Sequence, residues 1–194
     1  TVMLIDSAFL NLAIQDIKQY FERTLDRTLQ DIDLSSFIMY LALDAGITEG
    51  KNEIQVIFTY DTMSPKLIYC HPSNLKNELD GVAFNSPLGE FCFATTSPEE
   101  VVAREVLYYD LLQIVLDSTD VKKLVILAFN ETSEERLSDV LSAFIKKTVQ
   151  RKSENIKEII QFRLDEPASP IEYGWEMLAY PLMQAFGIKG EELQ

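Results

Sequence analysis

The chain has 194 residues, of which 17 are lysine or arginine and 31 are aspartate or glutamate, so its net charge is −14. Its contents of 47% hydrophobic and 25% charged residues are typical of a folded globular domain and exclude a disordered chain. The acidic excess argues against nucleic acid as a partner, because duplex affinity comes largely from lysine and arginine contacts with phosphates. We expect one domain over residues 1–194, since the length suits one core and no linker interrupts it.

The sequence carries no signal for a membrane or an export pathway. No apolar run approaches the ~20 residues that span a bilayer, and the first residues lack the basic segment that opens a secretory signal peptide. Cys70 and Cys92 are too few for a disulfide framework and lie in apolar, strand-like contexts. We therefore expect a cytoplasmic protein without membrane contact, whose two cysteines are reduced core residues.

The first third of the chain alternates between strand and helix patterns. An apolar strand over Val2–Asp6 ends in a carboxylate. Apolar residues then recur every four positions over 9–25, which predicts a helix with one buried face. Asp33 is suited to cap a second helix over 34–45. Residues 53–60 are rich in β-branched and aromatic side chains and predict the second strand.

A long excursion follows that strand. Residues 66–70 and 89–95 each predict a strand, and the segment 71–88 between them reads as a loop. Because no crossover helix joins these two strands, we expect them to be antiparallel neighbours. The excursion thus predicts a β-hairpin insertion around residues 66–95.

The second half of the chain predicts strands between helices. Three capping boxes, at residues 97–100, 132–135 and 169–172, mark helix starts. We expect the first helix to run to Asp117 and to be apolar over most of its surface. The unbroken apolar segment in 121–129 predicts a central parallel strand covered on both faces.

The last elements complete the predicted layers. Residues 158–164 predict the final strand, and the third capping box predicts an aromatic last helix kinked at Pro181. Strands that alternate with helices predict an α/β three-layer sandwich with a mainly parallel sheet, made mixed by the hairpin. In such sheets ligands bind beyond the carboxyl ends of the strands.

Carboxylate and amide groups follow three of the predicted strands, namely Asp6, Asp61 and the pair Asn130-Glu131. Asp110 is unusual in another way, since its helical neighbours are mostly apolar and it needs a partner or a raised pKa there. Carboxylates that face one cleft would suit a hard cation such as Mg²⁺. The alternative is that each of these groups caps a helix, closes a turn or faces solvent.

The arrangement of these elements resembles the PIN-like superfamily, and within it the NYN-type nuclease domains. The resemblance covers roughly residues 2–150 and rests on an aspartate after the first strand, an aspartate in the helix before the central strand, and a polar turn after that strand. In the family these groups bind a divalent metal for phosphodiester hydrolysis. The resemblance implies a metal site at Asp6, Asp110 and Glu131, with Asp61 or Asn130 assisting and Mg²⁺ or Mn²⁺ as the ion.

The polar turn departs from the family pattern. This chain has Asn130 where the family has an aspartate of its Gly-Asp-Ser-Asp-like turn, and the hairpin around 66–95 is not a usual family element. A nuclease must also approach a polyanion, which a net charge of −14 repels. The resemblance therefore points to a shared fold more than to a shared activity.

Two functional hypotheses follow. The first, which we favour, is a non-catalytic, degenerate domain that acts by binding another protein or a second copy of itself. The aromatic residues Tyr173, Trp175 and Tyr180 are the candidate interface for this contact. The second is a metal-dependent phosphodiesterase or nuclease that uses the carboxylate cluster. The sequence leaves open whether the chain is an enzyme. A basic cluster at Lys146, Lys147, Arg151 and Lys152 suits either an anionic partner or the C-terminal end of a helix.

Overall fold

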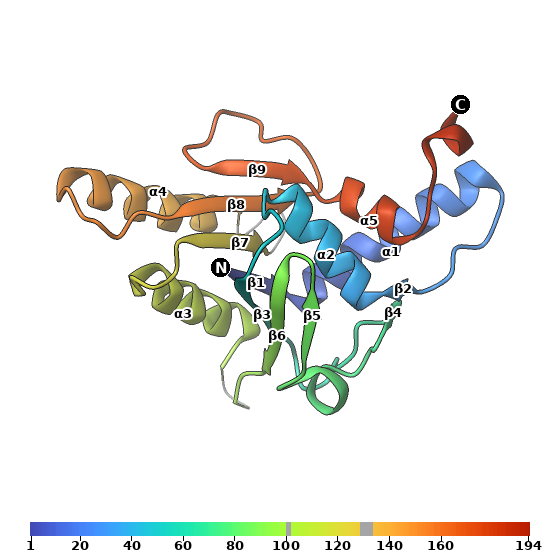
Figure 1. Cartoon of the computed structure of the whole chain (residues 1–194), viewed down its shortest axis with the longest axis horizontal. Helices are drawn as coiled ribbons and strands as arrows, with labels where there is room; N and C mark the ends of the chain where they lie inside the picture. The colour runs from blue at the N-terminus through green and yellow to red at the C-terminus, as the bar shows by residue number, and fades with distance from the viewer. Residues whose placement is uncertain (100–101, 129–133) are drawn as a thin grey trace.

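The computed structural model describes residues 1–99, 102–128 and 134–194 (Figure 1). Within these ranges seven strands form one sheet in the order β5-β6-β3-β1-β7-β8-β9. All neighbours are parallel except β5 and β6. The strands of the sheet are β1 (Val2–Asp6), β3 (Asn52–Thr59), β5 (Ala83–Ser86), β6 (Gly89–Thr96), β7 (Lys123–Leu127), β8 (Glu158–Arg163) and β9 (Gly174–Met177). The predicted α/β fold with a mainly parallel, mixed sheet is confirmed.

Helices cover both faces of this sheet. Alternate residues of β1 divide between two cores: Met3 and Ile5 pack in the cluster beneath α1, α2 and α5, whereas Val2 and Leu4 pack beneath α3 and α4. A central strand buried on both faces needs this continuous apolar composition. The helices are α1 (Ser7–Leu25), α2 (Leu34–Asp44), α3 (Arg104–Asp117), α4 (Glu134–Gln150) and α5 (Ala179–Ala185). None of the described helices is both long enough and apolar enough to cross a membrane.

The order in which successive strands join the sheet changes side at β1. From β1 it passes through α1 and α2 to β3 and then to β6, on one side of β1. It then crosses back through α3 to β7 and continues to β8 and β9 on the other side. Open α/β sheets bind ligands where the strand order reverses, outside the carboxyl ends of the strands. The carboxyl end of β1 is therefore the place to look for a site.

The hairpin exists, and its second strand, β6, is the strand predicted over 89–95, but its first strand is not the one predicted. The antiparallel partner of β6 is β5, and the stacked rings of Phe84 and Phe91, 4.8 Å apart, join the two strands. Residues 66–70 do not form a strand of this sheet, because their backbone is bonded elsewhere. The Asn11 side chain donates to the Lys66 carbonyl at 2.9 Å and accepts from the Ile68 N–H at 3.0 Å.

Four short elements connect the larger ones. Of the predicted 66–70 strand, Lys66 forms an isolated antiparallel bridge with Asn74. Its last residue belongs to β4 (Cys70–His71), which lies parallel to β2 (Ile32–Asp33) in a separate two-stranded sheet. A π-helical turn, η1 (Leu75–Leu79), lies inside the segment predicted as loop, and the 3-10 turn η2 (Gly190–Leu193) lies near the C-terminus.

The helix predicted from Ser97 begins later, at Arg104. Its N-cap residue, Ala103, makes no side-chain capping bond. The reason is topological: the chain leaves β6 on one side of β1 and must reach the layer of α3 before it can coil. The helix is also less apolar than predicted, because Val106 and Ile114 are exposed.

The C-terminal capping box at 169–172 does not start a helix. Residues after it form the edge strand β9, where Gly174 and Trp175 pair with Ile160 and Gln161 of β8. An added Cβ at Gly174 would lie 3.1 Å from the Ile159 carbonyl oxygen, so a small residue suits this close approach. The last helix, α5, begins at Ala179. Pro181 lies in its first turn and causes no kink there, since that position needs no N–H donor.

Candidate functional site

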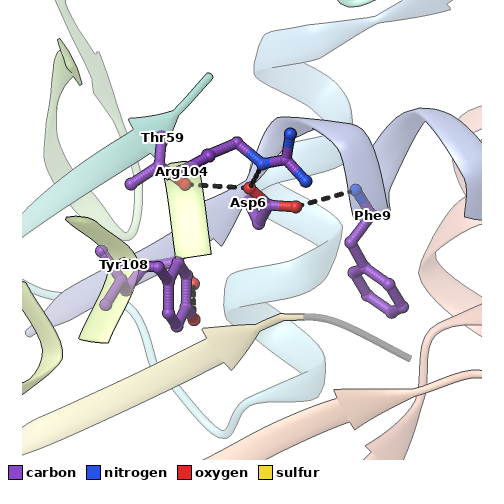
Figure 2. A network of polar contacts seen from close by, with 6 residues as sticks. Asp6, Phe9, Thr59, Arg104 and Tyr108 are labelled. Atoms are coloured by element: carbon purple, nitrogen blue, oxygen red, sulfur yellow. Dashed lines mark hydrogen bonds and ion pairs between the residues drawn. The ribbon is translucent and has the colours of Figure 1, made fainter. Parts of the chain in front are cut away.

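The side chain at the carboxyl end of β1, Asp6, is fully buried and holds three neighbouring elements together (Figure 2). Its Oδ2 atom accepts the N–H of Phe9 at 3.1 Å and so caps α1. Its Oδ1 atom accepts from the Thr59 hydroxyl of β3 at 3.1 Å and from Nε of Arg104 at 2.7 Å. The carboxylate therefore joins α1, β3 and α3 in one polar network.

The electrostatics of this network are those of a buried ion pair. Burial raises the pKa of the Asp6 carboxyl above its ordinary value, and the positive charge of Arg104 only partly opposes this shift. The Arg104 side chain is 24% exposed, so the pair reaches solvent only from its cationic side. A carboxylate placed here without a cation would be costly. Arg104 is therefore the counter-ion that lets Asp6 stay charged inside the fold.

One turn after Arg104, the helix α3 is anchored to the same strand. Tyr108 is fully buried, and its hydroxyl donates to the Leu4 carbonyl of β1 at 2.9 Å. Burial raises the pKa of Tyr108 well above the ordinary value, so the hydroxyl keeps its proton and stays a donor. This second contact fixes the direction in which Arg104 leaves the helix.

Asp61 lies near Arg104 but is engaged in a turn. Its Oδ1 atom accepts the Met63 N–H at 3.1 Å, which closes the bend after β3. Asp61 and Arg104 line one hollow of about 510 Å³, together with Ser7 and Ala8 at the start of α1. This hollow, which we call the β1-end hollow, is the cavity that adjoins the Asp6 network.

Asp110 does not lie where the sequence argument placed it. It is exposed on α3 rather than set into an apolar face, and it lies about 1.7 helical turns beyond Arg104, the residue of α3 that contacts Asp6. The apolar neighbours that suggested a buried face, Val106 and Ile114, are exposed with it. A charged side chain in water needs no partner, so the reason for expecting a special role at Asp110 is removed.

Within the described residues, no group of three or more histidine, cysteine, aspartate or glutamate side chains is arranged to hold a metal ion. The remaining candidates, Asn130 and Glu131, lie outside the described residues. The complete metal set of Asp6, Asp110 and Glu131 stays a prediction. Of the described carboxylates, Asp6 lies at the strand end that the prediction requires, and its oxygens already accept three hydrogen bonds.

The three aromatic residues predicted as an interface do not share one surface. Tyr173 packs against the core beneath α3 and α4, and Trp175 lines a hollow of about 390 Å³ with Ile145 of α4. Tyr180 is 62% exposed on α5, whose neighbours lie in the other layer. The prediction came from one continuous helix over these residues, whereas a strand carries Trp175 and a separate helix carries Tyr180.

A second hollow, which we call the α4 hollow, lies at the opposite end of the sheet from Asp6. It measures about 460 Å³ and is bounded by the last turns of α4 and the segment that leads into β8. Val149 and Ile156, which are 72% and 66% exposed, form part of its wall. It shares Ile145 and Lys157 with the hollow at Trp175, so the two adjoin.

The α4 hollow coincides with a local reversal of charge. Five of the chain's 17 basic residues lie between positions 146 and 157, where the only acidic residue is Glu154. Lys157 is structural, because its Nζ donates to the Val121 carbonyl at 2.7 Å and to Asn155 at 2.8 Å. The other four are exposed around the end of α4: Lys146, Lys147, Arg151 and Lys152.

The cysteines are free thiols in the described structure. Cys70 is buried, as predicted, and burial raises its pKa to about 12. Cys92 is only partly buried, because it lies near the sheet edge formed by β5 and β6.

Sequence reasoning missed Arg104, the residue that decides the character of the Asp6 site. One signal was available: a carboxylate at the end of a fully apolar strand must be neutralised, and a cation near the start of a later helix is a natural source. Arg104 stood inside the predicted helix, at a position where nothing in the local pattern distinguishes a buried cation from a solvated one. Only the packing of α3 over β1 brings it to Asp6.

The chain belongs to a family of unknown function, DUF6621, whose family model matches residues 1–193. No curated protein and no solved structure matches the chain.

Proposed function

We propose that this member of DUF6621 is a non-catalytic, PIN/NYN-like domain of the cytoplasm that acts by binding another protein. The single observation that carries the proposal is the ion pair between Asp6 and Arg104, at 2.7 Å. In the PIN-like superfamily, which the chain resembles, the aspartate after the first strand is a metal ligand. Here a guanidinium takes the position of the cation that such a carboxylate would bind.

The contacts of Asp6 make this replacement specific. A metal ligand must present an oxygen lone pair to the ion at ~2.0–2.6 Å. Both Asp6 oxygens face protein donors instead, Phe9 on one and Thr59 with Arg104 on the other. Binding Mg²⁺ would require breaking a buried charge pair and would place two cations against one carboxylate. The order β6-β3-β1-β7-β8 supports the PIN/NYN-like architecture, with Asp6 at the end of its central strand.

The surface that best supports protein contact is the α4 hollow. Exposed Val149 and Ile156 offer an apolar wall, and Trp175 lies in the adjoining hollow. Its exposed lysines and arginine carry positive charge on a chain whose net charge is −14. Two copies that met symmetrically through this surface would bring like charges together, so charge favours a different protein over self-association. The partner we propose presents an apolar side chain on an acidic segment.

The metal part of the proposal is tested by titration calorimetry with Mg²⁺ and Mn²⁺. We expect no binding at millimolar concentrations, and we expect that Arg104→Gln, which removes the resident cation, allows weak binding that Asp6→Asn abolishes. Saturable binding to the unaltered chain, lost in Asp6→Asn, would instead support the metal-dependent phosphodiesterase hypothesis and overturn our proposal.

The contact surface is tested with a defined peptide. Trp175 is the only tryptophan of the chain, so its fluorescence reports on the adjoining hollows. We expect an amphipathic peptide of leucine and glutamate to change this fluorescence saturably, and a leucine and lysine peptide of equal length not to. Val149→Asp should abolish the response, whereas Leu43→Asp, a matched change at an exposed leucine of α2, should not. Equal responses to both peptides, or an unchanged response in Val149→Asp, would contradict the proposed partner chemistry.

A further inference from the structure

We infer that the partner segment carries an arginine whose side chain binds in the hollow beside Trp175. This hollow, which we call the Trp175 hollow, measures about 390 Å³ and adjoins the α4 hollow, with which it shares Ile145 and Lys157. The inference rests on the proposed function, since it adds one residue to the acidic, apolar segment proposed for the α4 hollow. It comes from the lining of the Trp175 hollow, which differs from that of its neighbour in charge and chemistry.

The Trp175 hollow lies along the open edge of the sheet. Trp175 belongs to β9, the outermost strand beyond β8, and its side chain is only partly buried (Figure 1). Tyr173 also lines the hollow, and its hydroxyl donates to Oε1 of Gln161 at 3.3 Å, which holds the ring in place. Aromatic rings at such an edge bind either another apolar surface or a cation over the ring face, so the surrounding charges decide between the two.

The charges around these rings favour a cation. Three glutamates line the hollow, namely Glu158, Glu172 and Glu176. Glu158 pairs with Lys123 at 3.3 Å, whereas no ion pair joins Glu172 or Glu176 to any residue within 1–99, 102–128 or 134–194. Acidic side chains are common on this chain, so their number alone would not indicate a site. Here two of them line the same hollow as a partly exposed tryptophan.

The lysine in the lining does not neutralise these glutamates. The Nζ atom of Lys157 donates to the carbonyls of Ser118 and Val121 and to Oδ1 of Asn155. An ammonium group has three N–H donors, so these three acceptors use all of them. The negative charge of the hollow is therefore available to a cation from another molecule.

Arginine fits this lining better than lysine does. A guanidinium is weakly hydrated, stacks on aromatic faces and donates to a carboxylate through two N–H groups at once. The surface charge changes sign between the two hollows, from the exposed lysines and arginine at the end of α4 to Glu172 and Glu176 at β9. A segment that stayed acidic along its whole length would meet these glutamates with like charge. A segment that places its acidic, apolar part in the α4 hollow and an arginine on Trp175 is complementary to both.

The test lengthens the leucine and glutamate peptide by one glycine and one arginine, at the N-terminal end in one peptide and at the C-terminal end in another. The matched peptides carry glutamine in place of the arginine. In titration calorimetry with the unaltered chain, one of the two arginine peptides should bind about fivefold to tenfold tighter than its glutamine counterpart. This is the gain expected from one cation–π contact together with a charge-assisted hydrogen bond. Lysine in place of that arginine should bind less tightly.

Two double variants separate the site from a general attraction to an acidic chain. Glu172→Gln combined with Glu176→Gln should reduce the gain from arginine to less than about twofold. Glu49→Gln combined with Glu166→Gln removes two exposed glutamates that do not line the hollow, and it should leave the gain unchanged. Circular dichroism and unfolding curves confirm that both double variants are folded.

The outcomes distinguish this inference from the proposed function. Failure of the glutamine peptides to bind would contradict the proposed function, and the inference would fall with it. Binding of the glutamine peptides without a gain from arginine, or an equal gain in both double variants, would overturn the inference alone. Acetylarginine amide that binds as tightly as the arginine peptide would make a small organic cation the occupant. A dimer in light scattering that the change at Glu172 and Glu176 dissociates would make a second copy the occupant, and either result would overturn the inference.

Discussion

Replacing Arg104 by glutamine should destabilise the fold in a way that depends on pH. The substitution leaves Asp6 as a fully buried carboxylate without its counter-ion. Removing one partner of a buried pair costs ~3–5 kcal/mol, and the lower end applies here because Arg104 is 24% exposed and water can approach the vacated side. We expect a loss of about 3 kcal/mol at pH 7, which lowers the melting temperature by about 6–12 °C for a chain of this size.

The pH dependence follows from the direction of the Asp6 shift. Its folded pKa is raised above the unfolded value, so the stability linked to this group is present below the unfolded pKa and is lost as pH rises through the folded pKa. Arg104→Gln removes the largest influence that lowers the folded pKa, so the window moves upward. At about pH 3 and below, which is well under the ordinary aspartate pKa of ~3.9, Asp6 is protonated in both states, and the variant should lose only about 1 kcal/mol, the value of an ordinary hydrogen bond.

The assay is urea unfolding of both proteins at pH 7 and at about pH 3. Arg27→Gln is the matched control, because the pair of Arg27 with Glu192 is at the surface, with the two side chains 40% and 32% exposed, and should cost 0–1 kcal/mol at pH 7. Asp6→Asn added to Arg104→Gln should restore part of the loss at pH 7. A loss for Arg104→Gln that is the same at both pH values, or no larger than that of the control, would refute the ion-pair argument.

Three further predictions concern packing and the thiols. Tyr108→Phe should cost about 1–2 kcal/mol in urea unfolding, because it leaves a buried β1 carbonyl without its donor. Gly89→Ala should cost at least about 2 kcal/mol, because Gly89 has a φ of +131° and an added Cβ would lie 2.0 Å from a β3 carbonyl oxygen. Gly81→Ala is the control and should cost about 1 kcal/mol, since Gly81 has a φ of +77° but open space around it. Similar costs for the two variants would contradict the steric argument. In the folded protein an aromatic disulfide reagent should modify Cys92 before Cys70, because Cys70 is buried and its burial raises the pKa of the thiol to about 12. Fast reaction of both thiols without denaturant would show that the core opens at Cys70.

Several parts of the fold were predictable because their signals are local. The stripe of α1 and the cap at Asp33, whose side chain accepts the Ser36 N–H at 3.2 Å, depend on residues within a few positions of one another. The unbroken apolar segment of β7 also identified a strand buried on both faces. Periodicity and capping are properties of the chain itself, so they survive whatever the tertiary structure does.

The errors occurred where a distant partner decided the outcome. Residues 66–70 have a strand-like composition, but Asn11 of α1 bonds two of their backbone groups and the Ser73 carbonyl accepts the Leu67 N–H. The box at 169–172 has a good helix-start pattern, but the open edge of β8 binds the following residues as β9. In both cases a local preference of a few tenths of a kcal/mol yielded to tertiary hydrogen bonds and packing.

The candidate site divides in the same way. The sequence by itself determined that a carboxylate, Asp6, ends a buried central strand, because the apolar segment and its terminal residue are adjacent in the chain. Only the tertiary structure decided what that carboxylate meets. Arg104, 98 positions away, reaches it because α3 crosses β1 and places a guanidinium where a metal ion was predicted. The charge of a buried site is set by whatever the fold brings within a few ångströms, and such contacts leave no local pattern in the sequence.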